Sequence, residues 1–494
     1  MAVRISGMNS GLDTDSIVQD LVKAYSTKTD TYKKEQTTLQ WKQDAWKALN
    51  TKIYSFYSSS LSNMRFSSNY NAKKTTVSDE TKASVIASDG AVSGIQTLKI
   101  TDLAKAGYLT GDKLTTNDGS KLSSATKMSQ LGYTGSGSFT VTKGDGTTTS
   151  LSISENTTID QLTAGLTKAG LNANFDSSNG RIYVSAKTTG TAADFSFSGD
   201  TAALDALGLN NVNNKVAGSN AKITLNGVDY ESNSNAFTIN GMTITVKGKT
   251  GTDEELSLST DTDYDKIYDN IRNFFKEYNT LVNEMDSMYN AASSKGYDPL
   301  TDDEKSSMTD SQIEAWEKKI KDALLRRDDT VESVTSSMRM AMLQTYTVGG
   351  KTMSLSNFGI NTMGYFNAAD NEKNAYHIDG DANDSNTAGN QDKLKAAIAS
   401  NPTGVQDFFT QLSNNLYDTL SRKMRHTELS SAFTVYDDIR MKEEYDDYTT
   451  KISDWEKHVA DIEEKYYKQF TAMEKAMATL NSSQSALSGL LGSK

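Results

Sequence analysis

A long apolar stripe in the C-terminal arm constrains the fold of this chain more than any other feature. Apolar residues recur every three or four positions, which predicts one amphipathic helix of roughly 66 Å at 1.5 Å per residue. The stripe consists of Tyr448, Ile452, Trp455, Val459, Ile462, Tyr466, Phe470, Met473, Met477, Leu480, Leu487 and Leu491. A compact domain cannot cover a stripe of that length, so it needs a partner helix. We expect this stripe to stay uncovered within one copy and to be an assembly interface, with an intramolecular bundle helix as the alternative.

The N-terminal arm also has helical spacing, but a weaker one. We expect Leu12, Ile17, Leu21, Trp46, Leu49 and Ile53 to contribute to the same assembly interface. The middle of this arm, residues 26–38, is polar. A polar middle predicts a helix that becomes ordered only in a complex.

Residues 76–261 differ from both arms, because they are rich in Thr, Ser, Gly and Asn and contain no Trp or Pro. Short runs in which apolar and polar residues alternate flank four turn signals, and this pattern predicts β-hairpins. These signals are Asn240-Gly241, Asn226-Gly227, Asn179-Gly180 and Gly144-Asp145-Gly146. Residues 159–166 predict one short helix among the strands.

Between this insert and the C-terminal arm, three helical segments are predicted. The first covers residues 264–288, and the second starts at Ser311 with a capping box to Glu314 and keeps its apolar seam as far as Met338. The third covers residues 394–424 and is interrupted at Pro402 and Gly404.

The predicted fold class is α+β, with discontinuous helical or coiled-coil terminal legs flanking inserted β-rich head domains. We divide the chain into four parts. Residues 1–42 with 450–494 form a terminal coiled-coil leg, and residues 43–75 with 262–449 form a helical bundle leg domain. Residues 76–110 with 217–261 form one β-rich head domain, and residues 111–216 form a second, variable one.

Composition excludes several classes of protein. The 494 residues include 51 basic and 63 acidic side chains, a net charge of −12, so nucleic acid is not an expected partner. The absence of cysteine removes disulfides and thiolate zinc sites. No apolar run is long enough for membrane insertion, and the first residues lack the apolar stretch of a secretory signal. We therefore expect a chain that is cytoplasmic or exported without a cleaved signal peptide.

No constellation of residues supports an enzyme, a metal site or a cofactor. The run at residues 379–390 resembles a calcium loop at its first positions, but Asp384 and Asn390 stand where an EF-hand needs Gly and Glu. We interpret this run as a polar surface loop. The histidines His377, His426 and His458 are scattered, and each is expected on the surface.

Six ordered blocks resemble the flagellar filament cap family, whose members are called flagellar hook-associated protein 2. The blocks read ISGMNSGLDTDSIVQDLV, LQWKQDAWKALNTKI, ITLNGVDYESNSNAFTINGMTITVKG, YDPLTDDEK with IEAWEKKIKDALLRRD, NQDKLKAAIASNPTGVQDFF and YKQFTAMEKAMATLNSSQSAL. The resemblance covers most of both arms, whereas residues 111–216 resemble the short β modules of flagellin-type proteins only loosely.

This resemblance implies an oligomeric cap at the distal tip of the bacterial flagellar filament, outside the cell, which promotes the folding and insertion of exported flagellin. It implies a homo-oligomer, a pentamer in the first place and roughly four to six subunits as the range. The implied partners are flagellin, a hook-associated junction protein and an export chaperone on the C-terminal helix. The implied export route is the flagellar type III apparatus.

Two other functions stay open at this point. One is a hook–filament junction or flagellin-like structural subunit, which shares helical termini around an insert. The other is a surface adhesin whose β head binds host glycans such as mucin, because the insert is rich in Thr, Ser and Asn.

Overall fold

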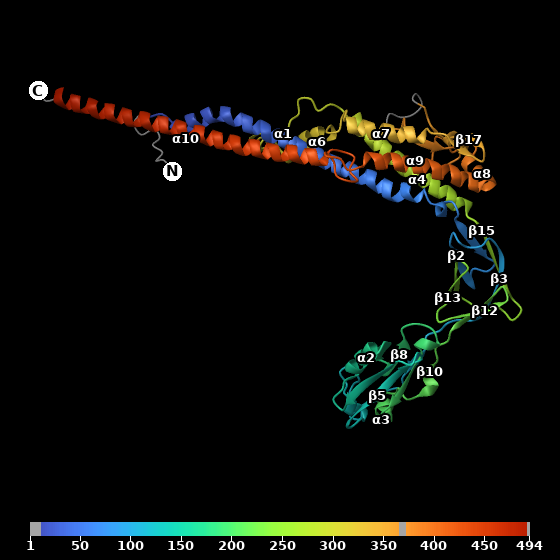
Figure 1. The fold of residues 1–494 in the computed structure, drawn as a ribbon. Helices are drawn as coiled ribbons and strands as arrows, with labels where there is room; N and C mark the ends of the chain where they lie inside the picture. Colours follow the sequence, from blue (N-terminus) through green and yellow to red (C-terminus); the bar gives the residue numbers. More distant parts are fainter. Residues whose placement is uncertain (1–10, 365–371, 492–494) are drawn as a thin grey trace. The chain divides into compact units, whose positions relative to one another are not determined.

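The chain folds into two compact units, each described by itself. The computed structural model describes residues 11–364 and 372–491, with only the backbone for residues 489–491. The first unit, here called the leg, comprises Met1–Tyr70 and Tyr264–Lys494, and the second comprises Asn71–Asp263. Helices of the leg flank the β-rich second unit in sequence (Figure 1). The predicted α+β fold, with discontinuous helical legs flanking inserted β-rich domains, is confirmed.

The leg is built from helices. Its two longest are α1 (Thr14–Phe56) and α10 (Asp438–Leu491), which lie side by side (Figure 1). The others are α4 (Tyr264–Tyr289), α5 (Asp302–Ser306), α6 (Asp310–Asp322), α7 (Asp329–Met342), α8 (Lys393–Ser400) and α9 (Pro402–Lys423). Two hairpins complete it, β16 (Tyr346–Val348) with β17 (Lys351–Met353) and β18 (Ile360–Thr362) with β19 (Tyr376–Ile378). None of the helices in the described residues is both long and apolar enough to cross a membrane.

An aromatic core holds the leg together where α4, α7 and α9 pack. Its fully buried rings are Tyr278, Phe274, Phe275, Phe358, Phe408 and Phe409. The ring centroids of Phe358 and Phe408 are 4.8 Å apart, and those of Phe408 and Phe409 are 5.2 Å apart. Each fully buried aromatic ring contributes roughly 1.5–3 kcal/mol. The bundle therefore has a core of its own, independent of α10.

The prediction that the polar middle of the N-terminal arm orders only in a complex is wrong. Residues 26–38 lie inside α1, which is continuous from Thr14 to Phe56. Their polar side chains bind neighbouring parts of the same chain, for example Lys33 to Glu456 and Lys34 to Glu304, both at 2.7 Å. Helical order here comes from these tertiary contacts, which composition alone does not reveal.

The prediction of one helix from Ser311 to Met338 is also wrong, because the segment forms two helices. The first, α6, is capped by Thr309 with a capping box to Gln312. Between the helices Arg327 adopts a positive φ of 54°, and the Asp328 carboxylate then accepts from the backbone of α7. The break does not disturb the apolar periodicity, because Leu324 and Val331 are one heptad apart and keep the seam in phase across it. The other predicted break, at Pro402, separates α8 from α9.

One half of the second unit consists of two sheets around a shared core. The five-stranded sheet has the order β1 (Lys73–Val77), β15 (Leu256–Thr262), β3 (Gly94–Asp102), β11 (Ala221–Leu225) and β12 (Val228–Ser232). The three-stranded sheet has the order β13 (Ala236–Ile239), β14 (Met242–Val246) and β2 (Ala83–Ala87). Asn226 and Asn240 both have a φ of 51°, as the two predicted Asn-Gly turns require.

The other half of the second unit has a separate hydrophobic cluster. One sheet has the order β10 (Lys215–Val216), β4 (Tyr108–Thr110), β8 (Arg181–Ala186) and β7 (Leu171–Asp176), and the other has the order β6 (Thr148–Ser154), β5 (Ser136–Lys143) and β9 (Phe195–Gly199). The helices are α2 (Ile159–Lys168) and α3 (Thr201–Ala206). The predicted helix and the hairpins β5–β6 and β7–β8 are confirmed. The finer four-part domain division stays a prediction.

Candidate assembly surface

Helices α1 and α10 run antiparallel, since falling residue numbers in one match rising numbers in the other. Gln43 donates to the Met441 carbonyl at 2.7 Å, and Gln36 donates to the Thr449 hydroxyl at 2.7 Å. Further along, Lys33 pairs with Glu456 at 2.7 Å. These polar contacts fix the register of α1 against α10, while the apolar stripe of α10 lies against α1.

Trp455 is the main anchor in the middle of this helix pair. Its indole N–H donates to the Tyr25 carbonyl at 3.1 Å, and Lys28 lies over its ring, with Nζ 4.3 Å from the centroid. A hydrogen bond with Tyr25 raises the pKa of the Tyr466 hydroxyl. Ile452 is 8 % exposed. This part of the stripe is therefore covered by the chain's own N-terminal arm.

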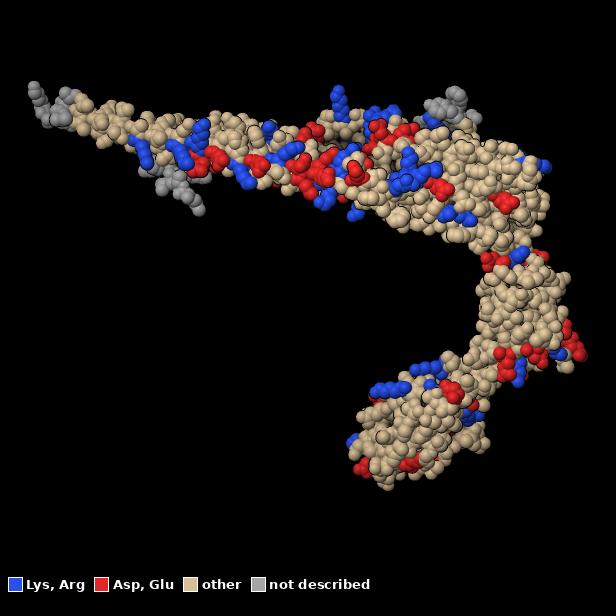
Figure 2. Space-filling model, viewed as in Figure 1, with Lys and Arg blue, Asp and Glu red and all other residues tan. Residues whose placement is uncertain are grey.

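The cover ends before α10 does. Glu474 is buried, and beyond it no side chain of α10 that the structure describes is buried. Met477 is 37 % exposed, Leu487 is 59 % exposed and Leu480 is 67 % exposed. The sequence has no charged side chain between Lys475 and Leu491, and in Figure 2 the end of α10 shows neither blue nor red. An exposed helix without charge is typical of a surface that binds a partner.

We define the distal surface as the exposed apolar residues at this end of the helix pair. It consists of Leu12, Leu21, Met477, Leu480 and Leu487. Burying each of these side chains fully would contribute roughly 1.5–3 kcal/mol to docking. The charge-free run was visible in the sequence, and it distinguishes the end of the stripe from its charged beginning.

The predicted interface residues fall into three groups. The first is buried within the chain and comprises Trp46, Leu49, Ile53 and Ile452. The second is half-buried and comprises Ile17, Tyr448, Trp455, Val459, Ile462, Tyr466, Phe470 and Met473. The third is the distal surface. The Leu491 side chain lies outside the described residues.

The prediction that the whole stripe is uncovered within one copy is therefore wrong. Its first two thirds pack on α1, because the ordered N-terminal arm supplies the partner helix. An intersubunit role stays a prediction, and we keep it for the distal surface, since the buried residues are already occupied inside one copy.

The polar run at residues 379–390 is a surface loop, as predicted, with most of its residues exposed, although Asp381 and Thr387 are buried. His377, expected on the surface, has a side chain that is only 10 % exposed and pairs with Asp384 at 2.6 Å. Thr387 is buried and donates to the Ile378 carbonyl at 2.8 Å. In the part of the chain that the structure describes, no three His, Cys, Asp or Glu side chains are arranged to hold a metal ion.

Both arms of the chain match models of one protein family. The model for the flagellar hook-associated protein 2 C-terminus matches residues 218–482, and the model for its N-terminus matches residues 10–107. The chain belongs to the flagellar hook-associated protein 2 family. Residues 108–217, which hold most of the second hydrophobic cluster of the β-rich unit, lie between the two matches.

Several relatives in this family match the chain over nearly its whole length. The flagellar hook-associated protein 2 of Halalkalibacterium halodurans is 25% identical and is aligned over 98% of this chain and 99% of its own length. That of Escherichia coli K12 is 24% identical over 97% of this chain and 96% of its own length. The crystal structure of the D1-D2-D3 domains of the flagellar cap protein FliD from Escherichia coli has a TM-score of 0.49 and 21% identity, and covers 76% of this chain and 95% of that chain.

Proposed function

We propose that this protein is an oligomeric cap at the distal tip of the bacterial flagellar filament, and that its distal surface docks the leg on the filament end. Family membership supports the flagellar role. The observation that carries the docking step is the exposed, charge-free end of α10, with Leu480 and Leu487 more than half exposed.

The geometry supports docking that can be reversed. Since the stripe is covered by α1 as far as about Glu474, the part of the stripe that is left to bind a neighbour, among the described residues, lies in the distal surface. A few partly exposed apolar side chains give a modest docking energy, because association also costs translational and rotational freedom. A leg held in this way can release and rebind while flagellin subunits fold and insert beneath the cap.

The same surface is the proposed site for an export chaperone. An uncharged apolar helix end would promote aggregation before export, so it needs cover inside the cell. In this proposal the protein leaves the cell through the flagellar type III apparatus without a cleaved signal, and the chaperone is exchanged for the filament at the tip.

Deletion of residues 476–494 tests the docking step. The truncation keeps every contact between α1 and α10 described above, so we expect the leg and the β-rich unit to stay folded. We expect docking on filament ends, and elongation of capped filaments by added flagellin, to be lost. Circular dichroism measures the fold, and electron microscopy of filament ends measures docking.

Point substitutions make the test sharper. Leu480→Gln with Leu487→Gln should weaken docking strongly. Ser482→Gln with Ser485→Gln introduces the same side chains at exposed serines of the same helix and should leave docking unchanged. Wild-type elongation by the truncated chain, or equal loss in both double variants, would contradict the proposed role of the distal surface.

A further inference from the structure

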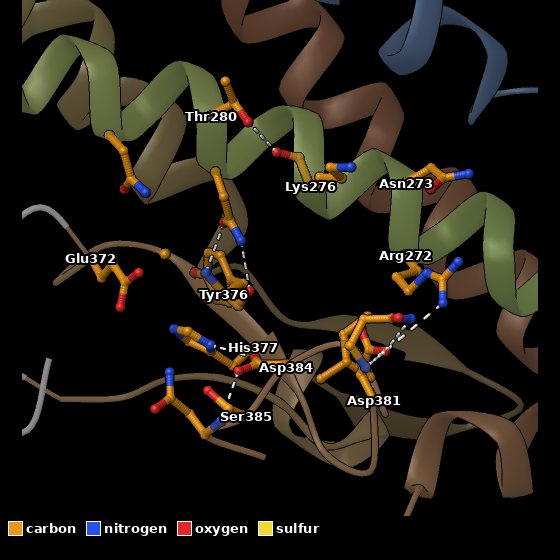
Figure 3. A pocket seen from close by; sticks show the side chains of 16 residues that line it. Arg272, Asn273, Lys276, Thr280, Glu372, Tyr376, His377, Asp381, Asp384 and Ser385 are labelled. Carbon is orange, nitrogen blue, oxygen red and sulfur yellow. Dashed lines mark hydrogen bonds and ion pairs between the residues drawn. The ribbon is translucent and has the colours of Figure 1, made fainter. Parts of the chain in front are cut away.

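A polar pocket in the leg, far along the sequence from the distal surface, has no role in docking as proposed above. One wall is α4, which presents Arg272, Lys276 and Thr280, and the opposite wall is the segment from Glu372 to Asn386 (Figure 3). The cavity has a volume of about 670 Å³. That volume is enough for a small organic ligand.

The walls of the pocket are fixed by hydrogen bonds. The Asn279 amide donates to the Tyr376 carbonyl at 2.7 Å and accepts from the Tyr376 N–H at 2.8 Å, which ties β19 to α4. Arg272 lies 3.8 Å from the Asp381 carboxylate across the pocket mouth (Figure 3). A ligand would therefore enter a preformed site rather than a loose loop.

Two polar atoms of the lining residues have no hydrogen-bond partner in the described part of the chain. They are Nε2 of His377 and Oδ1 of Asn283, and both are buried. The His377 side chain is nine-tenths buried. A buried polar atom without a partner costs about 1–3 kcal/mol. Both atoms belong to residues that line the pocket, so its wall holds two unmatched polar atoms.

The tautomer of His377 follows from its partner. Burial alone would raise the pKa of Asp384, but the hydrogen bonds that it accepts from His377 and the Asn386 N–H lower this pKa overall. Asp384 is therefore a carboxylate that can only accept, so Nδ1 of His377 carries the proton. In the neutral ring Nε2 is then an acceptor, as is Oδ1 of Asn283, and both require a donor.

The charged groups that line the pocket nearly balance, with one more carboxylate than cation. Arg272 is paired with Asp269 and Asp381, whereas His377, as a neutral ring, hydrogen-bonds Asp384 without cancelling its charge. The remaining charged lining residues are Lys276 and Glu372, one of each sign, and neither makes an ion pair with another described residue. The other polar groups are amides and hydroxyls, which suit a ligand that both donates and accepts hydrogen bonds without net charge.

We propose that this pocket binds a neutral, hydroxyl-rich ligand of the class of a sugar residue. Hydroxyl groups of such a ligand would donate to His377 and Asn283 and accept from Lys276. A metal ion is disfavoured because the carboxylates are already engaged with Arg272 and His377. An anion is disfavoured because Lys276 is offset by Glu372.

Saturation-transfer NMR on the full chain tests this proposal. The probes are the methyl glycosides of glucose, galactose and N-acetylglucosamine at about 10 mM, enough to detect a site of roughly 1 mM affinity. Glycylglycine serves as a zwitterionic probe of similar size. We expect at least one glycoside, and not glycylglycine, to receive saturation. The same glycoside coupled to albumin then shows whether the pocket accepts the sugar on a protein as well as free.

Asn283→Leu is the decisive variant. It removes an atom that makes no internal hydrogen bond, so the thermal stability should be unchanged or higher, while glycoside affinity falls about tenfold. Ser287→Ala changes an exposed residue on α4 outside the pocket and should leave affinity unchanged. Absence of saturation from all three glycosides, stronger binding of glycylglycine, or equal glycoside binding by Asn283→Leu would each overturn the proposal. Docking on filaments is a separate readout, so failure here does not affect the proposed cap function.

Discussion

At the residue scale, two glycines in the β-rich unit allow the cost of backbone strain to be measured apart from the cost of steric crowding. Gly227 and Gly241 both follow an asparagine in a two-residue turn and have φ values of 81° and 73°. A Cβ at Gly227 would meet no atom within 4 Å, whereas a Cβ at Gly241 would lie 2.8 Å from the Ala91 backbone nitrogen. The two turns share one conformation but differ in surroundings.

We therefore expect Gly227→Ala to lower the free energy of unfolding by about 1–2 kcal/mol, the cost of left-handed backbone in an L-residue. Gly241→Ala should cost clearly more, because Ala91 must also move. Urea denaturation of the full chain, monitored by the β-sheet signal of circular dichroism, measures both. Equal losses in the two variants would show that the contact with Ala91 adds nothing.

The residue scale also shows what can be predicted from sequence. The Asn-Gly turns were predictable because their preference is local: both residues need a positive φ whatever lies around them. The burial of His377 was not predictable, because its cover comes from Asp384 and from α4, which is distant in sequence. The same holds for the pocket, whose two walls come from separate segments.

At the scale of the element, α1 is held along its polar middle by ion pairs as well as by α10. Lys34 on α1 lies 2.7 Å from Glu304 on α5. The hydrogen bond from Lys34 is the largest cause that lowers the pKa of Glu304 from its ordinary value of 4.5. A carboxyl whose pKa is lowered by folding stabilises the folded state above its unfolded pKa, and this contribution is lost as the pH falls through the lowered value.

The stability difference between wild type and Lys34→Met should accordingly be present near neutral pH and should shrink as the pH falls below the ordinary Glu304 pKa of 4.5. The pair is partly exposed, so the difference should be small and should fall with added salt. Thermal melts of both proteins across this pH range measure it. A difference that stays constant with pH would show that Lys34 acts through packing alone. Lys451→Met, at an exposed lysine of α10, is the control.

Elements differ in how well the sequence predicts them. The long helices were predictable from unbroken periodicity, as in α4 and α10. The break between α6 and α7 was missed, because its signal is a local cap at Asp328 rather than a change in the seam. The extent of pairing between α1 and α10 was missed as well, because polar pairs such as Gln36 with Thr449 leave no periodic pattern.

At the scale of the whole molecule, the chain leaves the leg and re-enters it at two positions that are distant in sequence but close together in space. In the leg, the Asn270 amide donates to the Asn69 carbonyl at 2.9 Å, next to where the chain leaves and re-enters. In the second unit, the Asp263 N–H donates to the Ala72 carbonyl at 2.8 Å, and β1 pairs with β15 from Lys73 and Thr262 onward. Both sides of the junction are closed by their own hydrogen bonds.

We expect a chain in which residues 71–263 are replaced by a short Gly-Ser turn to fold as an intact leg. The aromatic core of α4, α7 and α9 lies entirely within the leg, so nothing in it depends on the insert. A cooperative thermal melt with helical circular dichroism checks this expectation. Non-cooperative melting of this chain would mean that the insert is needed for the leg to fold. The isolated residues 71–263 provide the reciprocal control.

The paired strands β1 and β15 have a mechanical consequence. A chain end that makes no cross-strand hydrogen bonds frays freely, because each residue offers two soft dihedral angles. Here β1 and β15 are the first and last strands of the β-rich unit, and a hydrogen-bonded ladder joins them from Lys73 and Thr262 onward. Neither end of this unit can therefore peel away from its sheet without breaking the ladder that holds the other end.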